Sequence, residues 1–97
     1  MPPTPEQERV EAIEELLDEH RLLINEQLAV LSWQERGEGL MSGLAARAKT
    51  PEARTAATRI SLALVAYQAF SRRLLLTWRH HEQGLRERLE TLTPGAR

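Results

Sequence analysis

The chain has 97 residues and a formal net charge of −1, and 41% of its residues are hydrophobic and 28% charged. This composition is typical of one small folded domain and excludes a disordered, collagen-like or low-complexity chain. Because the sequence contains no cysteine, it also excludes a disulfide framework, a thiolate nucleophile and a cysteine-based metal centre.

Residues 5–36 are predicted to form a first long helix, because Thr4 is a favoured N-cap followed by proline and Gln7 completes a capping box. Hydrophobic residues then recur every seven positions, which predicts a heptad-like seam along one face. The members of this seam are Val10, Leu17, Ile24 and Leu31. Gly37 and Gly39 are expected to end the helix.

A second long helix is predicted over residues 51–93, where Thr50 and the following proline repeat the start signal. Residues 37–49 carry apolar side chains at helical spacing and are expected to form a connector with a short helix. Ser71 interrupts the seam of the second helix. The other positions of that seam are expected to be Ala57, Ile60, Leu64, Tyr67, Leu74, Trp78, Leu85, Leu89 and Leu92. Residues 94–97 are expected to be a disordered tail.

The charge distribution favours an antiparallel pairing of the two helices. Residues 1–36 hold nine acidic and three basic side chains, a balance of −6, whereas residues 37–97 hold five acidic and ten basic, a balance of +5. Antiparallel pairing would bring the acidic start of the first helix near the basic end of the second. The expected fold is therefore all-α, a single domain over residues 1–97 built as a long antiparallel helical hairpin with a short connecting helix.

The second helix has more apolar surface than one seam requires. The candidate interface on its second face, with another copy of the chain or with a different protein, consists of Leu62, Val65, Ala69, Arg73 and Leu76. Three candidates could cover this second face: the connector, a second copy of the chain that completes a four-helix bundle, or a different protein. A homodimer is favoured, because a bare hairpin would expose a larger apolar patch than soluble monomers usually carry.

Residues 59–78 have the length of a membrane span, but Arg72 and Arg73 lie within them. Each arginine near a bilayer centre costs about 2.5–3.5 kcal/mol, so no membrane span is expected. The acidic N-terminus lacks the basic and apolar regions of a signal peptide, which favours a cytoplasmic protein. Export by a route that needs no signal stays open.

No catalytic, cofactor-binding or metal-binding residue is predicted, and the chain is not expected to be an enzyme. His80 and His81 are adjacent, so their side chains point about 100° apart on a helix, and no HxxxH or HExxH pattern is present. A metal or proton-switch role for them and for His20 stays open beside a structural one. The carboxylates of the first helix are interpreted as a solvated face, and "GEGLMSG" does not match a phosphate-binding loop.

Two functions of different classes remain. The first is a protein–protein interaction or assembly module, such as an adaptor, small helical chaperone or regulator, that binds a partner through an apolar helix face. The alternative is a nucleic-acid-associated regulatory dimer that uses the arginines of the second helix. The presence of only one lysine and the acidic first helix count against this alternative.

Two stretches resemble parts of known helical families. The end of the chain is similar in size and amphipathic periodicity to the small helical chaperones of flagellar and type III export; it reads "RRLLLTWRHHEQGLRERLETL". The stretch "WQERG", from Trp33 to Gly37, resembles the connector of the WxG-type secreted helical hairpins, with three intervening residues where that family has one. Neither resemblance assigns a functional residue.

Overall fold

The computed structural model describes residues 2–93, and over these residues the chain forms two helices and no strand. Helix α1 spans Pro5–Arg47 and helix α2 spans Pro51–Leu92. The predicted all-α fold is therefore confirmed. The tail expected at residues 94–97 lies outside the described residues.

Both helices begin at the predicted threonine–proline pairs. At α1, the Thr4 N–H donates to Gln7 Oε1 at 2.8 Å, and the Gln7 N–H donates to Thr4 Oγ1 at 3.2 Å. These reciprocal bonds form a capping box, which satisfies backbone donors that have no partner inside the helix. At α2, Thr50 Oγ1 accepts a hydrogen bond from the Ala53 N–H at 3.2 Å, so Thr50 is the N-cap of that helix.

The predicted end of the first helix is wrong. Helix α1 continues through Gly37 and Gly39 to Arg47, so the connector is only residues 48–50 and there is no separate connecting helix. A glycine inside a helix costs about 1 kcal/mol relative to alanine, which tertiary packing can offset. A Cβ atom on Gly37 would lie 3.3 Å from Leu64 Cδ1, so glycine permits the close approach of α2 at this point.

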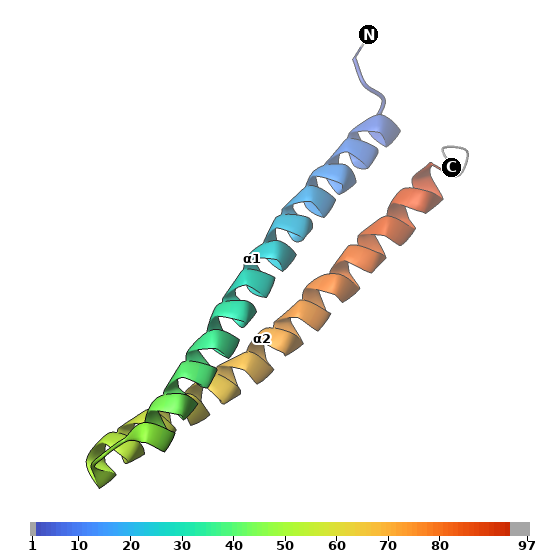
Figure 1. Ribbon diagram of the computed structural model, residues 1–97. Coiled ribbons are helices and arrows are strands. Elements are labelled where there is room, and N and C mark those ends of the chain that lie inside the picture. Colours follow the sequence, from blue (N-terminus) through green and yellow to red (C-terminus); the bar gives the residue numbers. More distant parts are fainter. Residues whose placement is uncertain (1, 94–97) are drawn as a thin grey trace. The chain divides into compact units, whose positions relative to one another are not determined.

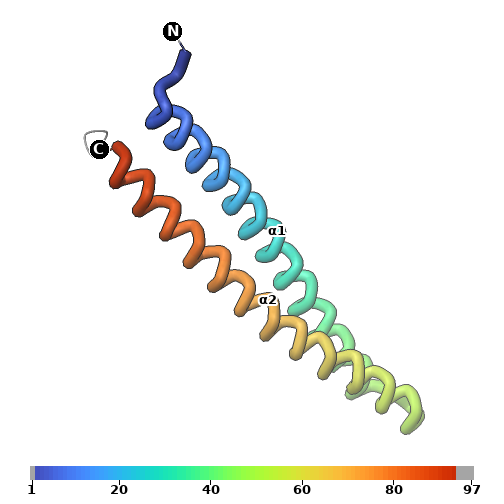
Figure 2. The backbone as a smooth tube through the Cα atoms, turned by 180° about the vertical axis from the view of Figure 1, so that it is seen from behind, coloured from blue at the N-terminus to red at the C-terminus, as the bar shows by residue number. Residues whose placement is uncertain are grey.

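The chain divides into two compact units. Unit 1 comprises Met1–Glu26 and Leu76–Arg97, and unit 2 comprises Gln27–Leu75. Within each unit, a segment of α1 and a segment of α2 run side by side in opposite directions (Figures 1 and 2). Over residues 2–93, neither helix contains a stretch that is apolar and long enough to cross a lipid bilayer.

The buried and half-buried side chains of both helices recur at alternating steps of three and four residues, and we call these positions the seam. In α1 they are Val10, Ile13, Leu17, His20, Ile24, Gln27, Leu31, Gln34, Glu38, Met41 and Ala45, and Ala48 continues the spacing in the connector. In α2 they are Ala57, Ser61, Leu64, Gln68, Ser71, Leu75, Trp78, Glu82, Leu85, Leu89 and Leu92; Leu74, beside Leu75, is also half-buried but lies outside this spacing. This spacing gives each helix the a and d positions of a heptad.

The seam of α2 departs from the prediction by one position in unit 2. Ile60 and Tyr67, expected in the seam, are 49% and 58% exposed. The next residue in each case, Ser61 or Gln68, lies in the seam instead. The difference arises because the inner line of α2 is partly polar, whereas the prediction followed the line with the more apolar side chains.

Candidate functional site

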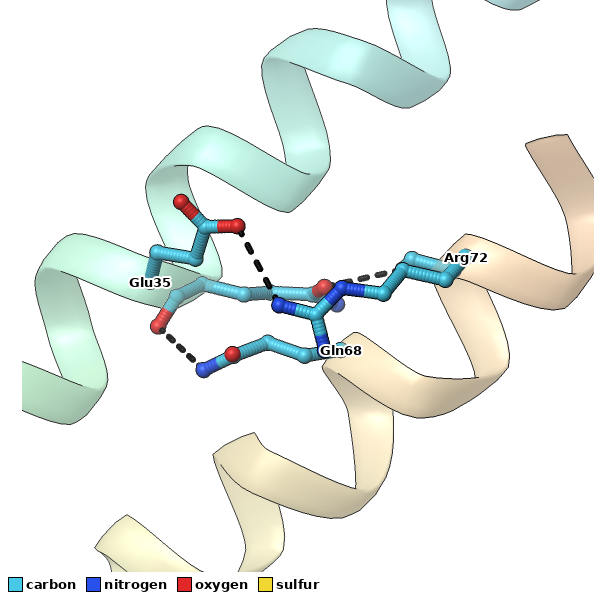
Figure 3. A network of polar contacts seen from close by, with 5 residues as sticks. Glu35, Gln68 and Arg72 are labelled. Atoms are coloured by element: carbon cyan, nitrogen blue, oxygen red, sulfur yellow. Dashed lines mark hydrogen bonds and ion pairs between the residues drawn. The ribbon is translucent and has the colours of Figure 1, made fainter.

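A layer of polar side chains lies in the seam of unit 2. Ser71, which is 2% exposed, donates its hydroxyl to Gln34 Oε1 at 2.8 Å. Gln68 is also buried, and its Nε2 donates to the backbone oxygen of Gln34 at 3.4 Å (Figure 3). We call Gln34, Gln68 and Ser71 the polar layer. Its two cross-helix bonds join α1 to α2, so the layer fixes their register in this unit.

Two more polar pairs join the helices of unit 2. Arg72 lies 3.5 Å from a carboxylate oxygen of Glu35, with both side chains about half exposed, as the dashed line between them in Figure 3 marks. Ser61 donates to Glu38 Oε1 at 3.4 Å. Solvent screens the exposed Arg72–Glu35 pair, so it contributes only about 0–1 kcal/mol.

Large apolar side chains line the opposite side of the unit 2 seam. In an antiparallel helix pair, the residues that precede the a positions of both helices lie on one side of the seam. The residues that follow the d positions, such as Glu35 and Arg72, lie on the other side of the seam. The preceding residues include four exposed apolar side chains, which we call the apolar edge. The apolar edge consists of Val30 and Leu44 on α1 and Ile60 and Tyr67 on α2.

The candidate interface predicted from the sequence is exposed and divided between the units. Leu62, Val65, Ala69 and Arg73 belong to unit 2, whereas Leu76 belongs to unit 1. On the helical wheel, Leu62, Ala69 and Arg73 lie away from the seam of α2, whereas Val65 follows the d position Leu64 and borders the seam on the same side as Arg72. We call Leu62, Val65 and Ala69 the outer face. The role of this face in binding stays a prediction.

The other predicted seam residues occupy less exposed positions than Ile60 and Tyr67. In unit 1, Leu17 and Ile24 are buried, and Val10 and Trp78 are half-buried. In unit 2, the half-buried members are Leu31, Leu64 and Leu74.

Unit 1 contains a cluster of three aromatic rings. The ring centroids of His20, Trp78 and His81 lie 5.9–6.0 Å apart, and each pair meets edge to face. His20 Nδ1 lies 2.8 Å from the backbone oxygen of Leu16; because a carbonyl oxygen only accepts, Nδ1 carries the proton. The cluster borders an open groove of about 340 Å³, which Arg88 also lines.

This cluster provides too few ligands for a structural metal site. Among the residues that the structure describes, no group of three or more His, Asp or Glu side chains could hold a metal ion. Structural zinc sites in proteins are almost always four-coordinate. His20 and His81 instead meet the indole of Trp78 through ring contacts, which is how aromatic side chains commonly pack.

Sequence reasoning missed Gln34 and Gln68 as central residues and treated Ser71 as an interruption. A signal was present: Gln34 continues the three–four spacing of α1, and Gln68 and Ser71 are three residues apart on α2. Polar residues that recur at seam positions of two helices expected to pair can satisfy one another.

Comparison with protein-family models, with curated proteins and with solved structures found no match to this chain. The site is therefore interpreted from its own residues and geometry.

Proposed function

We propose that this chain is a non-enzymatic assembly module that binds a protein partner through the apolar surface of unit 2. The observation that carries the proposal is the distribution of side chains about the unit 2 seam. Polar side chains occupy several positions of the seam itself, while Tyr67 and Phe70 are 58% and 56% exposed. Apolar side chains gain free energy when a partner removes them from water, whereas the polar layer is already satisfied within the unit.

The accessible surface of the chain supports this proposal. It measures 7547 Å², against roughly 5,700 Å² for a compact monomer of the same mass. The excess, about 1,900 Å², exceeds the roughly 800 Å² that one partner contributes to a standard protein interface. Of the 14 exposed large hydrophobic residues among those described, ten lie in unit 2, so that unit is the principal candidate for the interface.

Matched substitutions on α2 test the proposal. Tyr67→Glu places a carboxylate on the apolar edge, and Val65→Glu places one on the outer face, within the same unit and helix. We expect Tyr67→Glu to weaken association at least about tenfold, which corresponds to 1.4 kcal/mol, because a charge would be buried without a partner. Sedimentation of the purified chain and capture of partners from a cell extract measure the association, and circular dichroism checks the fold.

The two variants divide the outcomes. A larger loss with Val65→Glu would assign binding to the outer face, which is the interface predicted from the sequence. If both variants associated with every partner as strongly as the parent chain, the apolar surface of unit 2 would not be an interface and the proposal would fail.

A nucleic-acid-associated regulatory dimer is the second candidate, favoured by the charge of unit 2. That unit holds three acidic and seven basic residues, a net charge of +4. Its arginines with acceptors include Arg72, which pairs with Glu35, and Arg54, which donates to the backbone oxygen of Ala48 at 3.4 Å. A mobility shift on duplex DNA or RNA at low salt, lost as salt rises, would favour this candidate; no shift would remove it.

A further inference from the structure

Two histidine side chains from different helices meet within unit 1. His20 belongs to α1 and His81 to α2, and their ring centroids lie 6.0 Å apart. Zinc binds an imidazole nitrogen at about 2.0–2.1 Å, so two nitrogens on one tetrahedral ion lie about 3.4 Å apart. The outer torsion of a histidine side chain is broadly distributed. A small rotation of either ring can therefore bring one nitrogen from each histidine to that separation.

The ring of His20 has the hydrogen bond that is typical of a metal ligand. Its Nδ1 donates to the backbone oxygen of Leu16 at 2.8 Å, so Nε2 carries the lone pair that a metal ion requires. Metal-binding histidines almost always donate their other ring N–H to a carbonyl, a carboxylate or water, which fixes the tautomer and the ring orientation. His81 is exposed, so its ring can turn toward a bound ion without disturbing the buried side chains.

The open groove of unit 1 gives an ion access to both rings. His20 and His81 line this groove of about 340 Å³, which leaves space for water molecules to complete the coordination of an ion. Arg88 also lines the groove, but it is exposed, so water and salt screen its charge. Unit 1 as a whole holds 11 acidic and six basic residues, a net charge of −5, which raises the local concentration of cations.

We propose that His20 and His81 form an exchangeable site for one divalent ion of the late first transition series: Zn²⁺, Ni²⁺ or Cu²⁺. Imidazole suits these ions, whereas Mg²⁺ and Ca²⁺ prefer oxygen ligands. Two protein ligands do not close a structural zinc site, so water fills the remaining positions and the ion exchanges with solvent. Once one histidine has bound the ion, the other is held beside it, and this high effective concentration strengthens binding. The site belongs to unit 1 and goes beyond the function proposed for unit 2.

Substitutions that keep an aromatic ring test the two ligands. His20→Phe and His81→Phe each retain a ring beside Trp78 but remove the ring nitrogens, so each is expected to weaken Zn²⁺ and Cu²⁺ binding at least about tenfold. His80→Phe is the matched control, because His80 lines the same groove but its side chain points about 100° away from that of His81. Its affinity is expected to stay within about twofold of the parent chain. Isothermal titration calorimetry measures affinity and stoichiometry, and circular dichroism checks the fold.

Trp78 provides a spectroscopic readout at the site itself. Its ring centroid lies 5.9 Å from that of His20 and 6.0 Å from that of His81. Cu²⁺ has an unpaired electron and quenches the fluorescence of a nearby indole. The chain contains two tryptophans, so Trp33→Phe leaves Trp78 as the only one. In that background we expect Cu²⁺ to quench most of the fluorescence, with the midpoint found by calorimetry, and Mg²⁺ to leave it unchanged.

Electron paramagnetic resonance of the Cu²⁺ complex counts the coordinated nitrogens without relying on a variant's fold. A pair of imidazole nitrogens is expected in the parent chain and a single one in His81→Phe. Parent-like affinity in both His20→Phe and His81→Phe, or a Cu²⁺ complex without coordinated nitrogen, would assign the ion to carboxylates and overturn the inference. A larger loss with His80→Phe than with His81→Phe would also overturn it. These outcomes leave the proposed function standing, because substitutions in unit 2 test that function separately.

Discussion

At the scale of single residues, Ser71 is the most buried polar position among the described side chains. Its hydroxyl donates a hydrogen bond to Gln34 Oε1 at 2.8 Å. Among the described residues, every buried side-chain nitrogen or oxygen has a hydrogen-bond partner. When the partner of a buried polar group is removed, the protein loses stability. This loss is larger than the net stability that the hydrogen bond contributes when it forms. The stability of unit 2 therefore depends on keeping the polar layer complete.

Ser71→Ala is expected to lower the free energy of unfolding by about 1–2 kcal/mol, because it leaves Gln34 Oε1 without its donor. Ser61→Ala is the matched control: its hydroxyl lies 3.4 Å from Glu38 Oε1 and is only partly buried, so a loss below about 0.5 kcal/mol is expected. Urea unfolding of the two variants measures the difference. Equal losses would mean that the Gln34–Ser71 bond does not stabilise unit 2 beyond an ordinary surface contact.

The same residues explain why the helix register could not be predicted. Ile60 and Tyr67 form a more apolar line than Ser61 and Gln68, so hydrophobic periodicity selects the first line. The structure has the second line inside, where Gln34 of α1 bonds to Gln68 and Ser71. Which line of α2 faces inward therefore depends on Gln34, a residue of the other helix. The hydrophobic periodicity of α2 alone holds no information about that residue.

At the scale of helices, local chemistry predicted the starts of both helices but not the end of α1. Thr4 and Thr50 cap their helices through bonds to residues three positions away, so the signal is contained in the sequence itself. The glycines at 37 and 39 are also a local signal, but the seam continues beyond them to Met41 and Ala45. Contacts between helices decided this boundary, as they often override propensity.

The glycines of α1 differ in what surrounds them, which gives a prediction. A Cβ atom on Gly39 would meet nothing within 4 Å, whereas one on Gly37 would lie 3.3 Å from Leu64 Cδ1. Gly39→Ala is expected to stabilise the chain by about 0.5–1 kcal/mol, which raises the Tm by a few degrees. Gly37→Ala is expected to gain less, because Leu64 must shift. Calorimetry compares them, and a larger gain for Gly37→Ala would contradict the packing at this glycine.

At the scale of the whole molecule, few apolar side chains are buried within one copy. The buried hydrophobic residues among those described are Leu17, Ile24, Ala57 and Leu75. Burying one large aliphatic side chain contributes about 1.5–3 kcal/mol, and ordering each residue costs about 1–2 kcal/mol in backbone entropy alone. A single copy therefore has a small hydrophobic contribution for its length, and covering the apolar edge is expected to add to it.

This shortage predicts a melting temperature that depends on protein concentration. If folding is coupled to association, a hundredfold increase in concentration stabilises the folded state by about 2.7 kcal/mol, which raises the Tm of a dimer of this size by about 5–8 °C. Tyr67→Glu is expected to melt at a lower temperature that changes little with concentration, because it blocks the apolar edge. Scanning calorimetry between micromolar and hundred-micromolar chain measures both variants. A parent chain whose Tm stays constant over that range would be stable as a single copy, and its exposed apolar residues would then contribute nothing to its folding.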